Sequence, residues 1–146
     1  MANDIIRAKR YFERGVYYYE LSAWGECVAN MNDALELLPT HFEARMYLGA
    51  ALCKQARYLD AIRILEEGRK QPLDEPSRLR LLRLLAVISA VRQDYPAAQY
   101  YLRQALRLSP EDPALVNLAA STYCCAGDFD YGLELFRKAI VLSDGH

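Results

Sequence analysis

The sequence predicts an all-α protein built from helix pairs that repeat along the chain. Apolar residues recur at helical spacing over most of the 146 residues, and no segment alternates with the period of two that a strand requires. Gly15 and Gly49 are 34 residues apart, and so are Trp24 and Tyr58. A fixed period of this length indicates a repeat array, in which stacked helical units share one continuous core.

One register with a three-residue insertion accounts for this period and defines four units within a single repeat domain, residues 1–146. The units comprise residues 8–41, 42–75, 79–112 and 113–146, with residues 1–7 extending the first helix. The insertion consists of Pro76, Ser77 and Arg78. Each unit is expected to form two helices joined by a short turn.

The first two units show this organisation through their apolar runs. In the first, a helical run closes at Pro39. In the second, a run over residues 42–55 is interrupted at Ala56-Arg57-Tyr58, and the helical period resumes over residues 60–70.

The last two units carry clearer helix-boundary signals. Asp94 is predicted to cap a helix with Pro96 in its first turn, and Asp112 to cap a helix with Pro113 at its first position. Gly127 and Asp128 predict the turn of the fourth unit, with Gly127 ending one helix and Asp128 capping the next.

The repeat pattern resembles the tetratricopeptide repeat family, whose 34-residue unit carries W-x2-L-G-x2-Y, then A-x3-F and a terminal proline. The second unit matches it at Leu48, Gly49, Leu52, Tyr58, Ala61, Leu65 and Gly68. Two positions depart from the pattern, because Arg14 replaces a leucine and Asp144 replaces the last proline. The resemblance implies a right-handed superhelix of eight antiparallel helices in four pairs.

The same resemblance implies a concave groove, lined by the first helix of each unit, that holds a partner peptide or amphipathic helix. By similarity, the groove residues are Lys9, Phe12, Val16, Tyr19, Met46, Ala50, Cys53, Lys54, Arg80, Arg83, Val87, Val91, Asn117 and Ser121. Phe12, Val16 and Tyr19 form one apolar stripe by their spacing. The alternative is that these three side chains pack inside the array.

Charge is unevenly distributed along the chain. Residues 77–110 carry a formal charge of +5, and residues 111–146 carry −4. Arg80 and Arg83 would orient an acidic partner segment, because arginine pairs bidentately with carboxylates. The alternatives are two solvated faces, or a contact between the basic and acidic units of two copies.

The last helix is apolar on more than one side. Repeat arrays usually end in a polar-faced capping element, and none follows this helix. We therefore expect Phe136 and Ile140 to be covered by self-association or by a partner. The alternative is that the sequence is part of a longer array.

Several classes of protein are disfavoured by composition. The net charge of −1 argues against binding to nucleic acid or to anionic membranes. No apolar run is long enough to insert into a membrane, and no secretory signal is present, so a cytoplasmic location is expected. The four cysteines are expected to be reduced and to serve in packing.

Catalysis and cofactor binding are also not expected. His41 and His146 are isolated, so neither a metal site nor a nucleophile–base arrangement is predicted, and no phosphate-binding glycine motif occurs. The sequence thus predicts a non-catalytic protein-interaction module without cofactor, either an adaptor or a chaperone. In size and fold it resembles the chaperones of bacterial type III secretion. The competing prediction is a scaffold subunit that self-associates through its last repeat.

Overall fold

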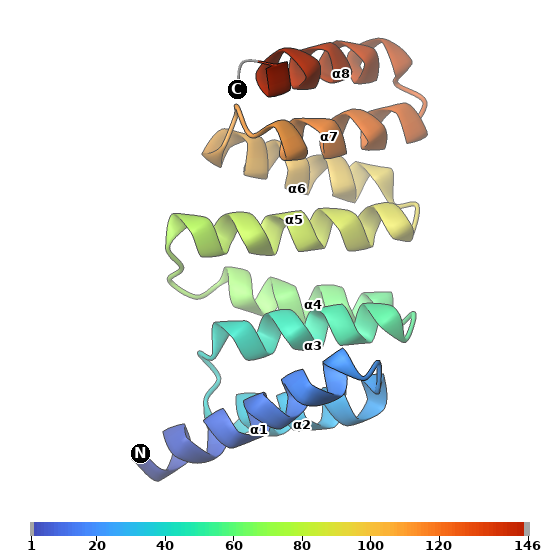
Figure 1. Ribbon diagram of the computed structural model, residues 1–146. Helices are drawn as coiled ribbons and strands as arrows, with labels where there is room; N and C mark the ends of the chain where they lie inside the picture. The colour runs from blue at the N-terminus through green and yellow to red at the C-terminus, as the bar shows by residue number, and fades with distance from the viewer. Residues whose placement is uncertain (1, 145–146) are drawn as a thin grey trace. The chain divides into compact units, whose positions relative to one another are not determined.

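The computed structural model describes residues 2–144, which form eight α-helices and no strand. This confirms the predicted all-α helical-repeat fold. The helices fall into two compact units, one ending at Pro72 and the other beginning at Leu73, each with two helix pairs (Figure 1).

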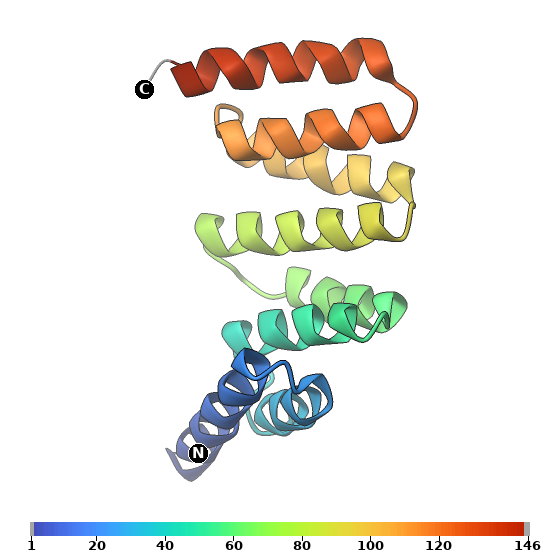
Figure 2. The same cartoon turned by 45° about the vertical axis from the view of Figure 1, so that its right-hand side comes forward.

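The first unit contains four helices in two antiparallel pairs. They are α1 (Ala2–Glu20), α2 (Trp24–Leu37), α3 (Phe42–Lys54) and α4 (Tyr58–Arg69). Helix α2 packs against both α1 and α3, and α4 packs against α3 (Figure 2). The core is built from small and medium side chains, including the fully buried Cys27, Met31, Leu48 and Leu65.

The second unit repeats this arrangement. Its helices are α5 (Glu75–Val91), α6 (Tyr95–Leu108), α7 (Pro113–Cys125) and α8 (Phe129–Asp144). Helix α6 packs against α5 and α7, and α7 packs against α8. The predicted caps are confirmed, because Asp94 accepts from the backbone N–H of Ala97 at 3.3 Å and Asp112 from that of Ala114 at 3.0 Å.

The residues assigned to the insertion lie in the first turn of α5. Pro76, Ser77 and Arg78 are helical, and α5 has 17 residues where α3 and α7 have 13 each. Asp74 caps this helix by accepting from the Ser77 N–H at 2.9 Å. Hydrogen bonds from Ser77 lower the pKa of Asp74. The extra residues therefore lengthen a helix at its N-terminus instead of forming a loop.

All four helix-pair turns share one backbone geometry. A residue with positive φ stands at the same register position in each: Ser22 (59°), Ala56 (61°), Gln93 (64°) and Gly127 (95°). The next residue donates its N–H across the turn at 2.9 Å in every case, as in a Schellman motif. The four turns therefore share the same backbone conformation, even where the residue with positive φ is not glycine.

Glycines allow the paired helices to approach closely. A Cβ at Gly15 would lie 3.0 Å from the sulfur of Met31, and a Cβ at Gly132 would lie 3.1 Å from the backbone oxygen of Ala120 and the nitrogen of Cys124. Gly25, in contrast, has no atom closer than 3.9 Å to such a Cβ. Packing therefore requires glycine at positions 15 and 132, and also at position 49, where a Cβ would lie 2.9 Å from the Leu65 side chain.

A buried arginine, which the sequence reasoning did not single out, ties the first unit together. Arg45 donates to the Pro39 carbonyl at 2.8 Å and to the Ile64 carbonyl at 3.1 Å, and it lies 3.5 Å from the Glu67 carboxylate. These bonds connect the α2–α3 loop to α4. The Pro39 carbonyl also accepts from the Gln71 side-chain amide at 3.1 Å, so removing Arg45 leaves it one donor and takes the side-chain donor from the Ile64 carbonyl.

His41 begins the third helix as a neutral imidazole. Its Nδ1 accepts from the Ala44 N–H at 3.1 Å, and its ring contacts that of Phe12. Burial lowers the pKa of His41, with weaker opposing contributions from its own backbone hydrogen bond and from Glu43. The acceptor role requires the unprotonated nitrogen, which is the form that burial favours.

Candidate protein-binding surfaces

In the first unit, two of the predicted groove residues, Phe12 and Tyr19, belong to a row of packed rings. Phe12 contacts Tyr47 with ring centroids 5.7 Å apart, Tyr47 contacts Tyr19 at 5.2 Å, and Tyr19 contacts Trp24 at 5.0 Å. The Lys54 ammonium lies 5.9 Å from the Trp24 centroid. The row thus joins α1, α2 and α3 through edge-on aromatic contacts.

These contacts leave little of the predicted apolar stripe open. Phe12, Val16 and Tyr19 are half-buried, as are Ala50 and Cys53. Met46 is buried, because α3 is packed by helices on two sides. Lys9 and Lys54 are exposed at the margins. The stripe therefore makes contacts within the unit and keeps part of its surface accessible.

The thiols near this row are poor nucleophiles. Burial raises the pKa of Cys27 to about 11, and it also raises the pKa of Cys53. Burial is likewise the main cause of the raised pKa of Tyr19. Because the thiolate is the reactive form of cysteine, the raised pKa values disfavour reactivity of Cys27 and Cys53.

In the second unit, the predicted groove residues of α5 are exposed. Val87 and Val91 have 38% and 53% of their surface accessible, and Arg80 and Arg83 are exposed on the same helix. Arg83, Val87 and Val91 are spaced four residues apart and form one stripe, here called the α5 stripe. It combines apolar contact area with a positive charge.

The predicted residues of α7 are polar and exposed. Asn117 and Ser121 lie one helical turn apart, and the Ser121 hydroxyl donates to the Asn117 carbonyl at 3.2 Å. Helix α7 carries no charged side chain at all. This face is therefore small and neutral.

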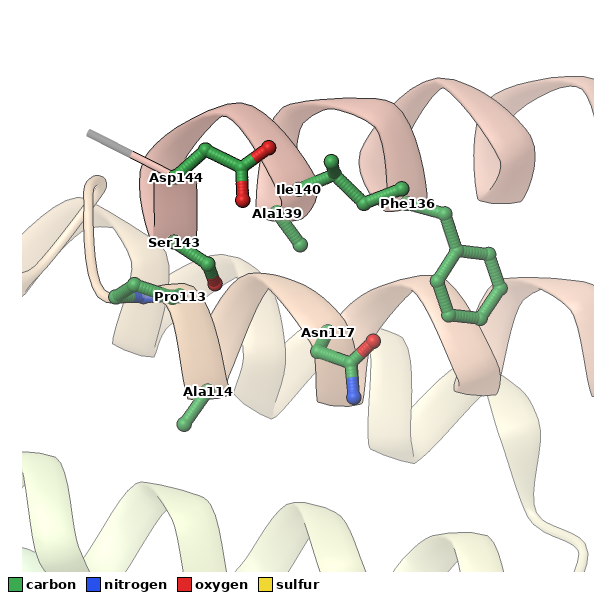
Figure 3. A pocket seen from close by; sticks show the side chains of 8 residues that line it. All are labelled: Pro113, Ala114, Asn117, Phe136, Ala139, Ile140, Ser143 and Asp144. Carbon is green, nitrogen blue, oxygen red and sulfur yellow. The ribbon is translucent and has the colours of Figure 1, made fainter. Parts of the chain in front are cut away.

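A pocket of about 500 Å³ lies between α7 and α8 and is open to solvent (Figure 3). It brings together residues predicted for two different surfaces, Asn117 from the groove and Phe136 and Ile140 from the last helix. Phe136 reaches from α8 alongside α7. Ile140 is 59% exposed, and Asp144 is the charged residue of the lining.

The exposed apolar surface of α8 extends beyond the two predicted residues. Phe129 and Leu133 are exposed, and with Phe136 and Ile140 they recur at i, i+4, i+7 and i+11, which places all four on one face. These four residues are here called the α8 stripe. The spacing alone could have revealed Phe129 and Leu133, which the sequence analysis did not name.

Residues 2–144 contain neither a cluster of metal-ligating side chains nor a candidate membrane-spanning helix. No group of three or more histidine, cysteine or acidic side chains is placed to hold a metal ion. No helix in this part of the chain has both the length and the apolarity to cross a bilayer. His146, one of the two histidines in the sequence, lies outside the described residues.

No protein-family model matches the chain, and no curated protein is similar to it in sequence. Solved structures are similar in fold. MamA from Desulfovibrio magneticus RS-1 is 22% identical with a TM-score of 0.83, covering 95% of this chain and 77% of that one. Another MamA structure is 19% identical with a TM-score of 0.82, covering 99% and 76%.

A third similar structure is that of YrrB, described as a TPR protein with an unusual peptide-binding site. It is 18% identical with a TM-score of 0.70, and the match covers 93% of this chain and 69% of YrrB. Identities at this level show a shared fold.

Proposed function

We propose that this chain, which has the tetratricopeptide-repeat fold, is a non-catalytic protein-interaction module that holds a peptide or amphipathic helix of a partner. The observation that carries the proposal is the α5 stripe. Two valines and an arginine stand exposed on one helix face, at positions where the family resemblance places the partner. Exposed apolar groups beside a fixed charge are typical of a recognition surface.

The charge of the stripe suggests the character of the bound segment. Arg80 and Arg83 lie one turn apart at its N-terminal end, so they would meet acidic side chains of the partner. Val87 and Val91 would contact apolar residues farther along the segment. An acidic amphipathic segment fits both halves.

The proposal is tested by selecting binding peptides from a displayed random library and measuring their affinities. The Val87→Asp, Val91→Asp double variant should weaken the selected peptides by at least about tenfold, because the carboxylates would oppose apolar contact. Val141→Asp on α8 is the matched control, since Val141 is exposed and lies outside the stripe.

The arginine is tested separately by charge reversal. Arg83→Glu should weaken binding and reduce its dependence on salt, whereas Arg103→Glu, an exposed arginine of α6, should leave both unchanged. Equal losses in the stripe variants and their controls would contradict the proposal.

The α5 stripe also suggests a more specific role, that of a chaperone or an adaptor. A chaperone or adaptor that shields an apolar segment of its partner needs exposed valines of this kind, and a cytoplasmic location would suit its reduced cysteines. The likeness to chaperones of type III secretion rests on size and fold. Co-purification of one exported subunit with the chain would support that role.

A second candidate is a scaffold that self-associates through its last repeat. The exposure of Ile140 beside the half-buried Phe136 favours it. In that case light scattering would show a mass above 16.7 kDa that rises with concentration, and Ile140→Asp would restore the monomer.

A further inference from the structure

Two helices of the described chain carry charges of one sign only. Helix α2 has three carboxylates and no lysine or arginine, and α6 has two arginines and no carboxylate. Every other helix of residues 2–144 carries both signs or, in the case of α7, no charge. Helices α2 and α6 each complete the first helix pair of a compact unit, so they hold equivalent places in the repeat.

The carboxylates of α2 share one exposed side of the helix. Glu26, Asp33 and Glu36 are exposed and lie within about 80° of one another around the helix axis. Ala29 is exposed on the same side and adds only a methyl group. None of the three carboxylates has an ion-pair partner among residues 2–144. These four residues are here called the α2 face.

Helix α6 presents an exposed basic side. Arg103 and Arg107 are exposed one turn apart, and Tyr100, which is 41% exposed, lies on the same side of the helix. These three residues are here called the α6 face. Neither arginine pairs with a carboxylate in the described part of the chain, whereas the neighbouring Arg92 lies 3.6 Å from Asp94. The α6 face therefore has two cations available to an acidic surface.

The two faces match in spacing when the helices run parallel. Ala29 and Glu36 are seven residues apart, as are Tyr100 and Arg107, which is about 10.5 Å along each axis. With the Tyr100 ring placed over Ala29, Arg107 lies beside Glu36, and the other arginine lies within one residue of Asp33. An antiparallel arrangement would set the ring against a carboxylate and one arginine against the alanine. The charges thus favour the parallel arrangement.

Charge complementarity makes a second copy of this chain the occupant of each face. Both faces belong to one molecule, so every copy offers an acidic and a basic side at the same concentration. The carboxylates of α8 are a poorer match for the α6 face. Arg137 and Lys138 follow Glu134 by three and four residues on that helix, where they reduce its negative charge.

We propose that the protein self-associates through the α2 face of one copy and the α6 face of the next, with the two helices parallel. Because the contact joins two different surfaces, the assembly grows beyond a dimer unless it closes into a ring. Exposed ion pairs contribute little each, so the association is weak and decreases with salt. The contact uses neither the α5 stripe nor the α8 stripe, and it goes beyond the proposed peptide binding.

Sedimentation velocity of the full chain measures this association. The protein is studied from about 20 μM to about 1 mM, because a weak contact requires high concentration. At about 20 mM NaCl the mean mass should rise above 16.7 kDa with concentration. At about 300 mM NaCl the association constant should fall by at least about fivefold, since salt screens exposed charges.

Charge reversal tests the pairing of the two faces. Arg103→Glu with Arg107→Glu should weaken the association by at least about tenfold, and so should Asp33→Arg with Glu36→Arg. All four substitutions in one chain should restore it, because each face then meets the opposite charge again. An equimolar mixture of the two double variants should associate for the same reason.

A matched control separates the contact from net charge. Arg137→Glu with Lys138→Glu changes two exposed cations of α8 and lowers the net charge as much as the α6 double variant does. It should change the association by less than about threefold. Far-UV circular dichroism checks that every variant is folded.

Four results would overturn the inference. The first is a monomer over the whole concentration range at low salt, and the second is a failure of the four-substitution variant to associate. The third is an equal loss in the α8 control, which would reflect net charge alone. The fourth is an association that survives both face variants but is removed by Ile140→Asp, which would support self-association through the last repeat instead. None of these results depends on whether the α5 stripe holds a peptide.

Discussion

Glycine substitution at the left-handed turn residues offers a sharp test of the repeat architecture. Ala56 and Gln93 hold φ values of 61° and 64°, in a region that non-glycine residues rarely adopt. The left-handed conformation costs a residue with a Cβ about 1–2 kcal/mol. Glycine avoids this cost but loses about 0.5–1 kcal/mol more backbone entropy on folding.

The difference predicts that Ala56→Gly and Gln93→Gly each stabilise the protein by about 0.5–1 kcal/mol. Gly127→Ala should destabilise it by a similar amount. A Cβ at Gly127 would meet no atom within 4 Å, so that change reports backbone strain alone. For a chain of this size, each kcal/mol shifts Tm by about 3 °C.

Thermal and urea unfolding followed by circular dichroism measure these shifts. Ala29→Gly is the control, because Ala29 is exposed inside α2, where glycine should cost about 1 kcal/mol. If Ala56→Gly lowered the stability as much as Ala29→Gly does, the left-handed turn at Ala56 and the shared turn geometry would both be refuted.

Three further predictions concern packing and titration. Gly132→Ala should destabilise by about 1–3 kcal/mol, because its methyl group would press on backbone atoms of α7, whereas Gly25→Ala should stay within about 0.5 kcal/mol in urea unfolding. Arg45→Met should cost about 2–4 kcal/mol by the same assay, because it removes the hydrogen bonds of a buried guanidinium to the Pro39 and Ile64 carbonyls, while the exposed Arg63→Ala should cost under about 1 kcal/mol. The lowered pKa of His41 means that its contribution to stability is complete above its unfolded pKa, about 6.5, and declines as the pH falls below it. His41→Asn keeps an N-cap that does not titrate, so the loss of stability between about pH 7.5 and pH 5.5 should be smaller in this variant.

The sequence predicted those helix boundaries that are marked by a capping aspartate or by a glycine after the helix. Asp94 and Asp112 cap helices as their side chains predict, and Gly127 has the left-handed backbone expected of a glycine after a helix. Ala56 and Gln93 adopt the same conformation without any signal in their residue type. Only the repeat register shows that Ala56 and Gln93 are equivalent to Gly127. Tertiary packing holds the backbone in the left-handed conformation at these two positions.

The candidate surfaces were harder to read, because spacing identifies a helix face but not what covers it. Phe12 and Tyr19 have the spacing of an open stripe, yet the ring of Tyr47 packs against both. Val87 and Val91 have similar spacing and are exposed. The two cases differ through side chains on neighbouring helices, which a one-dimensional pattern does not resolve.

Methyl NMR on the full chain, with labelled valine, leucine and isoleucine, tests the central claim most directly. On adding a peptide selected for tight binding, the account predicts shifts of the Val87 and Val91 methyl signals that saturate at the measured affinity. The methyl signals of Leu59, which is exposed on α4, should stay in place. Saturating shifts at Leu59 with unchanged Val87 and Val91 signals would contradict the claim that the α5 stripe holds the partner.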